Sequence, residues 1–557
     1  MTTRQRVVVV TGGGGGIGGA IAEALGHSGW FVVTVDPMVT LEGTEELPEP
    51  ETTTVGRILA GGGSARASSA SVTDAGAVRA LFEELAAERG GLDAVVNVAG
   101  ITRQSYYARG TEEDWQALLS VHLGGYLNVL DAALPLMAAA GHGRIVGVTS
   151  GSGWRAADAG GYSAAKRAVA ALTWQLGAHA PPGVTVNALS PIANTRMVAA
   201  AVERARQEGR AGGGGGLTLD SMPGPDQLGP LGAHLVGDSF GWCTGQVVFA
   251  SGPEAAIVDR PRLMEVVRTT GAASLRTLLA SFVPRALLKA EANQASAGGG
   301  NPRFGRIFDE PAPDVEPGAV AEVRSCAVVA DGRAEMAGPL IAALEARSIT
   351  CHQVSAARDF GGASKALQAI VDRAGPVDAV VLALGAHSST STTTPQEWTS
   401  ILADHHGIVE HLHADAAWSR AVADYAARAN RPVRLVTLTT AASAAGRSRA
   451  QAAVQLARVA AGATEKRVTA FAVGIEAPDA DAAPVAGELV GHLLTEPEAA
   501  PLAGAELVIG PGWLGLRSHP RPVGTVTYGG PEVPEWIDDA FREMVGGPAP
   551  PHDVEAG

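Results

Sequence analysis

The chain has 557 residues, 46% of them hydrophobic, and a formal net charge of −15. The length predicts more than one domain, and the apolar content is sufficient for large buried cores. The acidic balance argues against nucleic acid or an anionic membrane surface as a main partner. Three cysteines, Cys243, Cys326 and Cys351, form no CxxC pair, which favours a reducing cytoplasm over a disulfide framework.

The start of the chain also favours a cytoplasmic protein. Arg6 leads directly into an apolar run, which leaves no room for a signal peptide. No apolar run approaches the roughly 18 residues of a membrane span, so we expect no membrane partner.

The first strand and helix enclose a glycine-rich turn. Val7–Val10 is a β-branched run typical of a buried parallel strand, and Thr11-Gly-Gly-Gly-Gly-Gly-Ile-Gly18 follows it. Glycines let the chain turn sharply and approach a ligand closely, and a helix from Ile17 to Leu25 would point its N-terminus at a pyrophosphate. The turn therefore predicts a dinucleotide site.

Asp36 ends the second predicted strand, Trp30 to Val35. A carboxylate there accepts hydrogen bonds from the adenosine ribose hydroxyls and repels a 2′-phosphate, so it favours NAD (NADH) and disfavours NADP. The alternative is a turn residue before Pro37.

Strands and helices alternate to about residue 250, which predicts a doubly wound parallel sheet. Leu92–Asn97 and Arg144–Thr149 are predicted buried strands of this sheet. The segment from Met38 to Ala70, rich in Gly, Pro and Glu, is expected to be an exposed elaboration.

Tyr162 and Lys166 stand four residues apart in Gly-Gly-Tyr-Ser-Ala-Ala-Lys, and Ser150 lies twelve residues before the tyrosine. Positions i and i+4 of a helix share a face, so the lysine cation would favour the ionised phenol. These residues predict a general acid/base, Tyr162, with Ser150 orienting the substrate oxygen. The alternative is a surface Tyr and Lys on an ordinary helix.

Together these motifs resemble the short-chain dehydrogenase/reductase family over most of the first 260 residues. The glycine turn fits its Thr-Gly-x-x-x-Gly-x-Gly pattern, Asn97-Val-Ala-Gly100 its Asn-Asn-Ala-Gly segment, and Asn187-Ala-Leu-Ser-Pro191 with Thr195 the segment that closes over the nicotinamide. The resemblance implies catalytic roles for Ser150, Tyr162 and Lys166. It implies cofactor contacts at Thr11, Gly12, Gly16, Ile17, Gly18, Asp36, Val72, Asn97, Ala99, Gly100, Tyr162, Lys166, Pro191 and Thr195.

His122 is a further catalytic candidate. Val121-His122-Leu123 stands where many family members have an asparagine that holds a proton-relay water, and the sequence is closest to a branch with (3R)-hydroxyacyl-CoA dehydrogenases. His122 would orient that water or titrate in the relay. Packing of a helix is the alternative. His405 has the same seven-residue offset from Trp398 as His122 has from Trp115, which favours packing.

The second half repeats the first in the same order. Val377–Gly385 repeats Leu92–Gly100, Arg434–Thr440 repeats Arg144–Ser150, and Ala503–Gly510 echoes Thr244–Ser251. We therefore expect an α/β protein with two tandem Rossmann-like doubly wound parallel sheets.

The chemistry is missing from this second copy. Leu382 replaces Asn97 and Thr440 replaces Ser150, and no tyrosine occurs between Tyr425 and Tyr528. Its opening turn places acidic Asp331 and Glu335 where a pyrophosphate would lie. The histidine-rich run from His405 to His413 reads as an ordinary helix, and no metal site is expected.

The expected division is a catalytic domain at 1–260, a helical extension at 261–292, a linker at 293–320, a degenerate Rossmann-like domain at 321–547 and a tail at 548–557. The glycine run 212–216 stands where the family has a mobile substrate loop. The degenerate domain is expected to replace a partner subunit, giving an internal pseudo-dimer, and two chains would form a homodimer.

The expected function is an NAD(H)-dependent oxidoreductase that interconverts a small-molecule ketone and a secondary alcohol, with a 3-oxoacyl/3-hydroxyacyl thioester as the substrate class. The alternatives are a natural-product (polyketide or steroid-like) ketoreductase and a non-catalytic, NAD-responsive scaffold.

Overall fold

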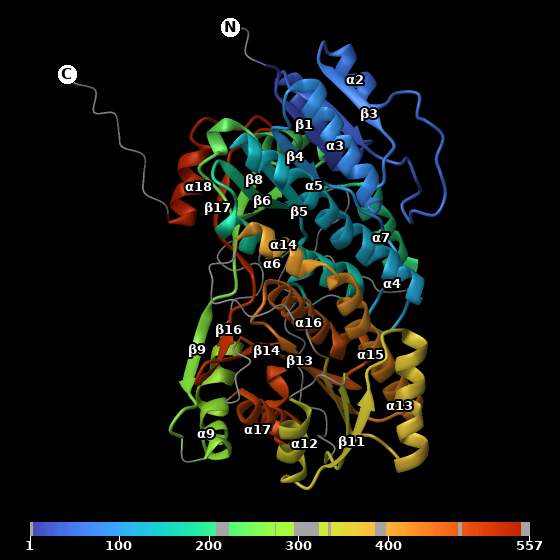
Figure 1. Cartoon of the computed structure of the whole chain (residues 1–557), viewed down its shortest axis with the longest axis vertical. Helices are drawn as coiled ribbons and strands as arrows, with labels where there is room; N and C mark the ends of the chain where they lie inside the picture. Colours follow the sequence, from blue (N-terminus) through green and yellow to red (C-terminus); the bar gives the residue numbers. More distant parts are fainter. Residues whose placement is uncertain are drawn as a thin grey trace, which may run out of the picture.

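The structure is a computed structural model that describes residues 4–156, 158–207, 222–272, 274–294, 322–331, 336–384, 397–476 and 482–546. The two halves of the chain form two α/β units, most of the blue-to-teal part above and most of the yellow-to-orange part below in Figure 1, while green and red segments occur in both. The predicted glycine hinge 212–216, the tail, Glu335 and the linker from residue 295 lie outside the described residues.

Within the described residues, the first sheet has nine strands in the order β17-β8-β7-β6-β5-β4-β1-β2-β3. Its parallel strands are β1 (Val7–Thr11), β2 (Phe31–Val35), β3 (Ser64–Ser68), β4 (Ala94–Asn97), β5 (Gly143–Val148), β6 (Val184–Pro191) and β7 (Val247–Ser251). Antiparallel β8 (Glu254–Asp259) and β17 (Arg521–Thr527) follow at one edge.

Helices cover both faces of this sheet. Several of them begin at a polar residue whose side chain accepts a hydrogen bond from the first turn. Asp74 caps the third helix by accepting from Ala77 N at 2.9 Å, and Thr111 and Asp114 form a capping box at the fourth. The helices are α1 (Gly16–His27), α2 (Thr54–Ala60), α3 (Ala75–Arg89), α4 (Glu112–Leu119), π-helical η1 (Ser120–Gly124), α5 (Gly125–Ala140), η2 (Gly151–Gly153), α6 (Gly160–His179), α7 (Arg196–Gln207), η4 (Pro225–Gln227), α8 (Gly229–His234) and η5 (Asp238–Phe240).

The segment from Met38 to Ala70 is more than an exposed elaboration. Its second part forms α2 and the edge strand β3, which pairs in parallel with β2. The prediction missed this strand because Ser64-Ala-Arg-Ala-Ser68 is polar and none of its residues is fully buried.

The second sheet follows the order β11-β10-β12-β13-β14-β15-β16-β9. Its strands are β10 (Ser325–Ala330), β11 (Thr350–Ser355), β12 (Ala379–Ala383), β13 (Val433–Thr440), β14 (Val468–Ile475), β15 (Glu506–Gly510), β16 (Trp513–Arg517) and β9 (Leu263–Arg268). From β11 to β16 this order repeats that of β2 to β8 in the first sheet. The predicted fold class, two Rossmann-like sheets in tandem, is confirmed.

The helices of this half lie around its sheet in Figure 1. They are α9 (Leu275–Phe282), η6 (Val283–Leu287), α10 (Leu288–Ala292), α12 (Ala337–Glu345), α13 (Phe360–Ala374), α14 (Trp398–His405), α15 (Ile408–Ala429), α16 (Ala444–Ala463), α17 (Ala482–Thr495) and η7 (Pro497–Leu502).

The two halves exchange their last strands. β9 follows β8 in the chain but pairs with β16 in the second sheet, and β17 follows β16 but pairs with β8 in the first. Figure 1 shows green β9 in the lower unit and red β17 in the upper one. Helix α18 (Ile537–Val545) also returns to the first half, where Ile537 and Phe541 join its core.

This exchange corrects two sequence predictions. The extension predicted as helical over 261–292 begins with strand β9. The division at residue 321 also separates the chain in sequence but not in space, because residues 521–545 complete the first unit. Strand partners more than two hundred residues away leave no signal in a local pattern.

Helices join the two halves. α6 lies against α16, α4 against α15, and α14 against both α5 and α6. One hydrophobic core runs through the contact and includes Trp115 and Leu119 from the first half and Trp418 and Leu456 from the second. The run Glu112–Ala140 is long and apolar enough to cross a membrane by length and composition, but 67% of its most apolar window is buried inside the protein, as in a core helix.

Candidate functional site

The site lies where parallel strands of the first sheet end. Thr11 closes β1 and Asn97 closes β4, and their side-chain oxygens lie 2.7 Å apart in a hydrogen bond. The Thr11 hydroxyl also accepts from Ala99 N at 3.2 Å. These bonds fix the two strand ends beside each other, and carboxyl ends of such strands are where ligands bind in open α/β sheets.

The glycine turn fits closely over this edge. Gly12 has a φ of +65°, and a Cβ there would lie 2.9 Å from Ala99 N. A Cβ on Gly18 would lie 2.2 Å from the carbonyl oxygen of Gly12, so the helix can approach the turn only with glycine at that position. Gly16 has a φ of +55° with open space around it. Glycine is favoured there by the left-handed backbone conformation and not by lack of space.

The start of α1 is suited to a phosphate group. Gly16, Ile17 and Gly18 form its first turn, and within the described chain no side chain caps this end. The backbone N–H groups there are free to bind an anion, with the helix dipole favouring negative charge. These residues therefore fit the pyrophosphate of a dinucleotide.

Asp36 lies against the glycine turn. Its Oδ2 accepts from Gly14 N at 3.0 Å and its Oδ1 accepts from Met38 N at 2.9 Å. Each carboxylate oxygen has a further acceptor position, so the side chain can hold the turn and still accept from a ribose hydroxyl.

The remaining predicted cofactor residues lie around this edge. Val72 is buried and packs directly against Gly125. A Cβ on Gly125 would clash with the Val72 side chain. Pro191 ends β6. The Thr195 hydroxyl accepts from Val198 N at 3.2 Å at the start of α7.

Tyr162 and Ser150 are brought together. The nearby Ser150 side chain lowers the pKa of the phenol, but burial has the larger effect and raises that pKa above its ordinary value. The predicted depression of the tyrosine pKa by Lys166 is therefore not the dominant effect. Sequence spacing could not anticipate this, since it contains no measure of burial.

Lys166 is buried beside the tyrosine. Its Nζ lies 5.7 Å from the centroid of the Tyr162 ring and donates a 2.6 Å hydrogen bond to the Val148 carbonyl at the end of β5. The Thr149 hydroxyl donates in turn to the Lys166 carbonyl at 2.6 Å. Burial lowers the pKa of the Lys166 ammonium to about 7.

His122 lies in π-helix η1 with its ring nearly perpendicular to that of Tyr162, at a centroid distance of 5.1 Å. Its Nε2 lies 2.8 Å from the carbonyl oxygen and 3.2 Å from the nitrogen of Ile101. Burial, followed by the Lys166 charge, lowers the pKa of His122 to about 3. With this pKa the ring is neutral near pH 7, which favours the water-orienting role over the titrating role of the two catalytic roles considered for it.

Two residues that sequence reasoning missed hold the start of α6. Asp158 accepts from Gly160 N at 2.9 Å and from Tyr107 N at 3.1 Å. Gly160 has a φ of +47°, and a Cβ there would lie 1.6 Å from the Ser105 carbonyl oxygen. The glycine before Gly161-Tyr162 is the sequence signal for this close approach.

The second half has no equivalent constellation in its described residues. Helices α6 and α16 are both 20 residues long, and the positions of Tyr162 and Lys166 correspond to Gly446 and Ala450. His405 is buried between the Ile401 carbonyl and the Ser448 hydroxyl, at 2.7 and 2.9 Å, which is a packing role. No group of three metal-ligating side chains occurs in the part of the chain that the structure describes.

Comparisons with known proteins identify the family of this chain. The short chain dehydrogenase family model matches residues 6–206. Nodulation protein G of Azospirillum brasilense is 33% identical over 258 residues, which cover 44% of this chain and 97% of that protein. The 3-oxoacyl-[acyl-carrier-protein] reductase FabG of Thermotoga maritima is 30% identical over 184 residues, covering 32% of this chain and 73% of the relative.

A solved structure extends the likeness in fold to both halves. The N-domain of a bacterial malonyl-CoA reductase, crystallised with NADP, superimposes with a TM-score of 0.62 at 16% identity and covers 91% of this chain and 97% of that one. The sequence matches and the fold lead to one assignment. The chain belongs to the short-chain dehydrogenase family and is an oxidoreductase that acts on hydroxyl or keto groups.

Proposed function

We propose that this protein interconverts a ketone and a secondary alcohol with NAD(H), using Ser150, Tyr162 and Lys166 of the first half. The observation that carries the proposal is the position of the Tyr162 ring, with the Ser150 side chain close enough to lower the phenol pKa and the Lys166 ammonium 5.7 Å from the ring centroid. A binding scaffold needs no such group of three, so the arrangement favours an enzyme over the scaffold alternative.

Tyr162 is the proton donor during reduction and the proton acceptor during oxidation. Burial raises the pKa of its phenol, so the resting tyrosine is neutral and holds the proton that ketone reduction requires. Ser150 donates a hydrogen bond to the same substrate oxygen and orients the carbonyl. Lys166 supplies positive charge beside the phenol as proton transfer begins.

The glycine turn, Asp36, Asn97 and Thr195 would hold the nicotinamide cofactor, which supplies or accepts the hydride when bound. Asp36 supports NAD over NADP, because its carboxylate lies against Gly14 where a 2′-phosphate would meet negative charge. The FabG relative is named a 3-oxoacyl-[acyl-carrier-protein] reductase. We extend that substrate class to this chain.

We also propose that the second half takes the place of a partner subunit in a cytoplasmic protein, and that two chains associate as a homodimer. The packing of α6 against α16 supports the internal pseudo-dimer, because it buries helix faces that an isolated first half would expose.

The test is turnover of purified protein with NADH and NADPH against acyl-thioester, steroid and quinone ketones, beginning with acetoacetyl-CoA. Tyr162→Phe should lower turnover at least about a hundredfold, because it removes the transferable proton, and leave NADH affinity nearly unchanged. Tyr528→Phe, whose hydroxyl contacts only the Gly252 carbonyl among described partners, is the matched control. Near-normal activity of Tyr162→Phe would exclude the proposed mechanism.

A further inference from the structure

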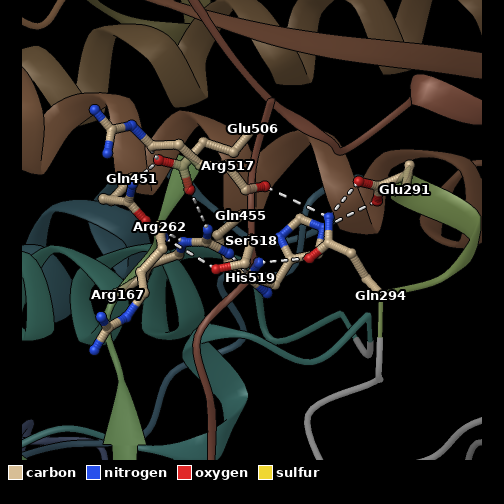
Figure 2. Close-up of polar contacts among 10 residues, drawn as sticks. All are labelled: Arg167, Arg262, Glu291, Gln294, Gln451, Gln455, Glu506, Arg517, Ser518 and His519. Carbon is tan, nitrogen blue, oxygen red and sulfur yellow. Dashed lines mark hydrogen bonds and ion pairs between the residues drawn. The ribbon is translucent and has the colours of Figure 1, made fainter. Parts of the chain in front are cut away.

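Arg167 directly follows Lys166 and is fully buried between the two halves. Its guanidinium donates across the contact to three side chains of the second half, as Figure 2 shows. The partners are Gln451 Oε1 at 2.9 Å, Glu506 Oε2 at 3.2 Å and Gln455 Oε1 at 3.4 Å. Gln451 also donates to Glu506 at 2.6 Å. Arg167, Gln451 and Glu506 are therefore all hydrogen-bonded to one another.

Gln455 links this network to the chain between Ser150 and Tyr162, which we call the catalytic segment. Its Nε2 donates to the Ser152 carbonyl at 3.1 Å and to the Arg155 carbonyl at 2.7 Å. Both carbonyls lie between Ser150 and Tyr162 in the chain. The orientation of the amide is fixed chemically, because an arginine can only donate and a carbonyl can only accept.

The turn that Gln455 holds is directly bonded to Ser150. Ser152 N donates to the Ser150 hydroxyl at 3.2 Å, and Gly153 N donates to the Ser150 carbonyl at 2.9 Å. A shift of the Ser152 peptide therefore moves the Ser150 side chain that lies beside Tyr162.

Only the second half supports the other half in this way. Counted from the first residue of each 20-residue helix, Gln451 in α16 corresponds to Arg167 in α6, and Gln455 corresponds to Ala171. An alanine cannot reach the second half as Gln455 reaches the first. A second copy of α6 in place of α16 would also bury two arginines against each other, which is strongly unfavourable.

Arg167 and Glu506 are both buried in this network. Burial lowers the pKa of Arg167 to about 10 and raises the pKa of Glu506, and each ion partly offsets the effect of burial on the other, with Arg517 as a second cation near Glu506. Removal of one partner leaves a buried group unpaired, which costs more than the net value of the bond.

We propose that Gln455 of the second half is a positioning residue for the reaction at Ser150 and Tyr162, acting through the Ser152 and Arg155 carbonyls and held in place by Arg167. The inference rests on the proposed function, since it concerns the same site. It gives the non-catalytic half a specific role in catalysis.

The experiment compares Gln455→Ala and Gln455→Glu with Gln175→Ala in the full chain. Gln175 is the matched control, because it also joins α6 to α16, through Ser448 and Arg447, without touching residues 150–156. The glutamate variant keeps an acceptor for Arg167 but cannot donate to the two carbonyls. We expect kcat with acetoacetyl-CoA to fall about tenfold or more in both Gln455 variants, with the NADH Kd unchanged, and to stay within about twofold in the control.

Amide hydrogen exchange of residues 151–156 provides a second readout that needs no turnover. We expect faster exchange there in both Gln455 variants and not in Gln175→Ala. Equal exchange and equal kcat in Gln455→Glu and wild type would overturn the proposal. If the intact chain turns over no ketone, the proposed function fails, and the exchange result alone then decides whether Gln455 holds the segment.

Discussion

The Lys166 ammonium donates to the Val148 carbonyl at 2.6 Å, which ties the catalytic helix α6 to the end of strand β5. This bond satisfies one of the three N–H donors of a lysine that is otherwise taken out of water. This bond does not replace all the hydration that the ammonium loses on burial, and the pKa of Lys166 falls from 10.5 to about 7. The charge beside Tyr162 therefore depends on pH in the physiological range.

The first prediction concerns stability and pH. Below about pH 7 Lys166 is protonated in both the folded and unfolded states, so the cost of burying the cation is fully present. Between about pH 7 and the unfolded pKa of 10.5 the unfolded chain holds a proton that the folded chain has released. The free energy of unfolding should therefore rise with pH across this window, relative to Lys166→Met.

Urea unfolding of wild type and Lys166→Met at a series of pH values measures the difference. Lys365→Met, at an exposed position of α13, is the control and should run parallel to wild type. A constant difference between wild type and Lys166→Met at all pH values would contradict the lowered pKa.

The second prediction concerns His122. Its pKa of about 3 keeps the imidazole neutral from about pH 5 to about pH 8. His122→Asn should therefore leave the shape of the pH profile of kcat/KM unchanged over that range, even if the rate falls through the loss of contacts to Ile101. An ionisation near pH 6 that is present in wild type and missing in the variant would restore the titrating role.

The candidate catalytic residues could be proposed from the sequence because their spacing is local. Tyr162 and Lys166 are one helical turn apart, Asn97 ends a predicted strand, and Ser150 directly follows another. The pKa values of Tyr162 and His122 could not be predicted, since they depend on burial by residues from several elements. The strand exchange and the contact of Gln455 with Ser152 were also inaccessible, because each joins residues hundreds of positions apart.

The third prediction concerns the choice of cofactor. Asp36→Asn removes the negative charge but keeps one oxygen that can accept from Gly14 N or Met38 N, so the glycine turn should keep its shape. The ratio of kcat/KM for NADPH to that for NADH should rise about tenfold or more, because the repulsion of a 2′-phosphate is removed. Adding an arginine at the neighbouring Pro37 should raise the ratio further. A wild-type enzyme that already prefers NADPH would contradict the role given to Asp36.

The last prediction is that residues 1–292 do not form an active, monomeric protein on their own. Without the second half, β8 loses its partner β17, and Phe240 loses the packing of Phe541. The face of α6 that covers α16 becomes exposed, and Arg167 loses all three of its side-chain acceptors. Open sheet edges and apolar helix faces favour aggregation.

The fragment should therefore aggregate or self-associate with much reduced turnover, and co-expression with residues 293–557 should recover soluble, active protein. Size-exclusion chromatography and NADH-dependent reduction of acetoacetyl-CoA measure both properties. A fragment that is monomeric and as active as the full chain would show that the second half neither replaces a subunit nor supports the catalytic segment.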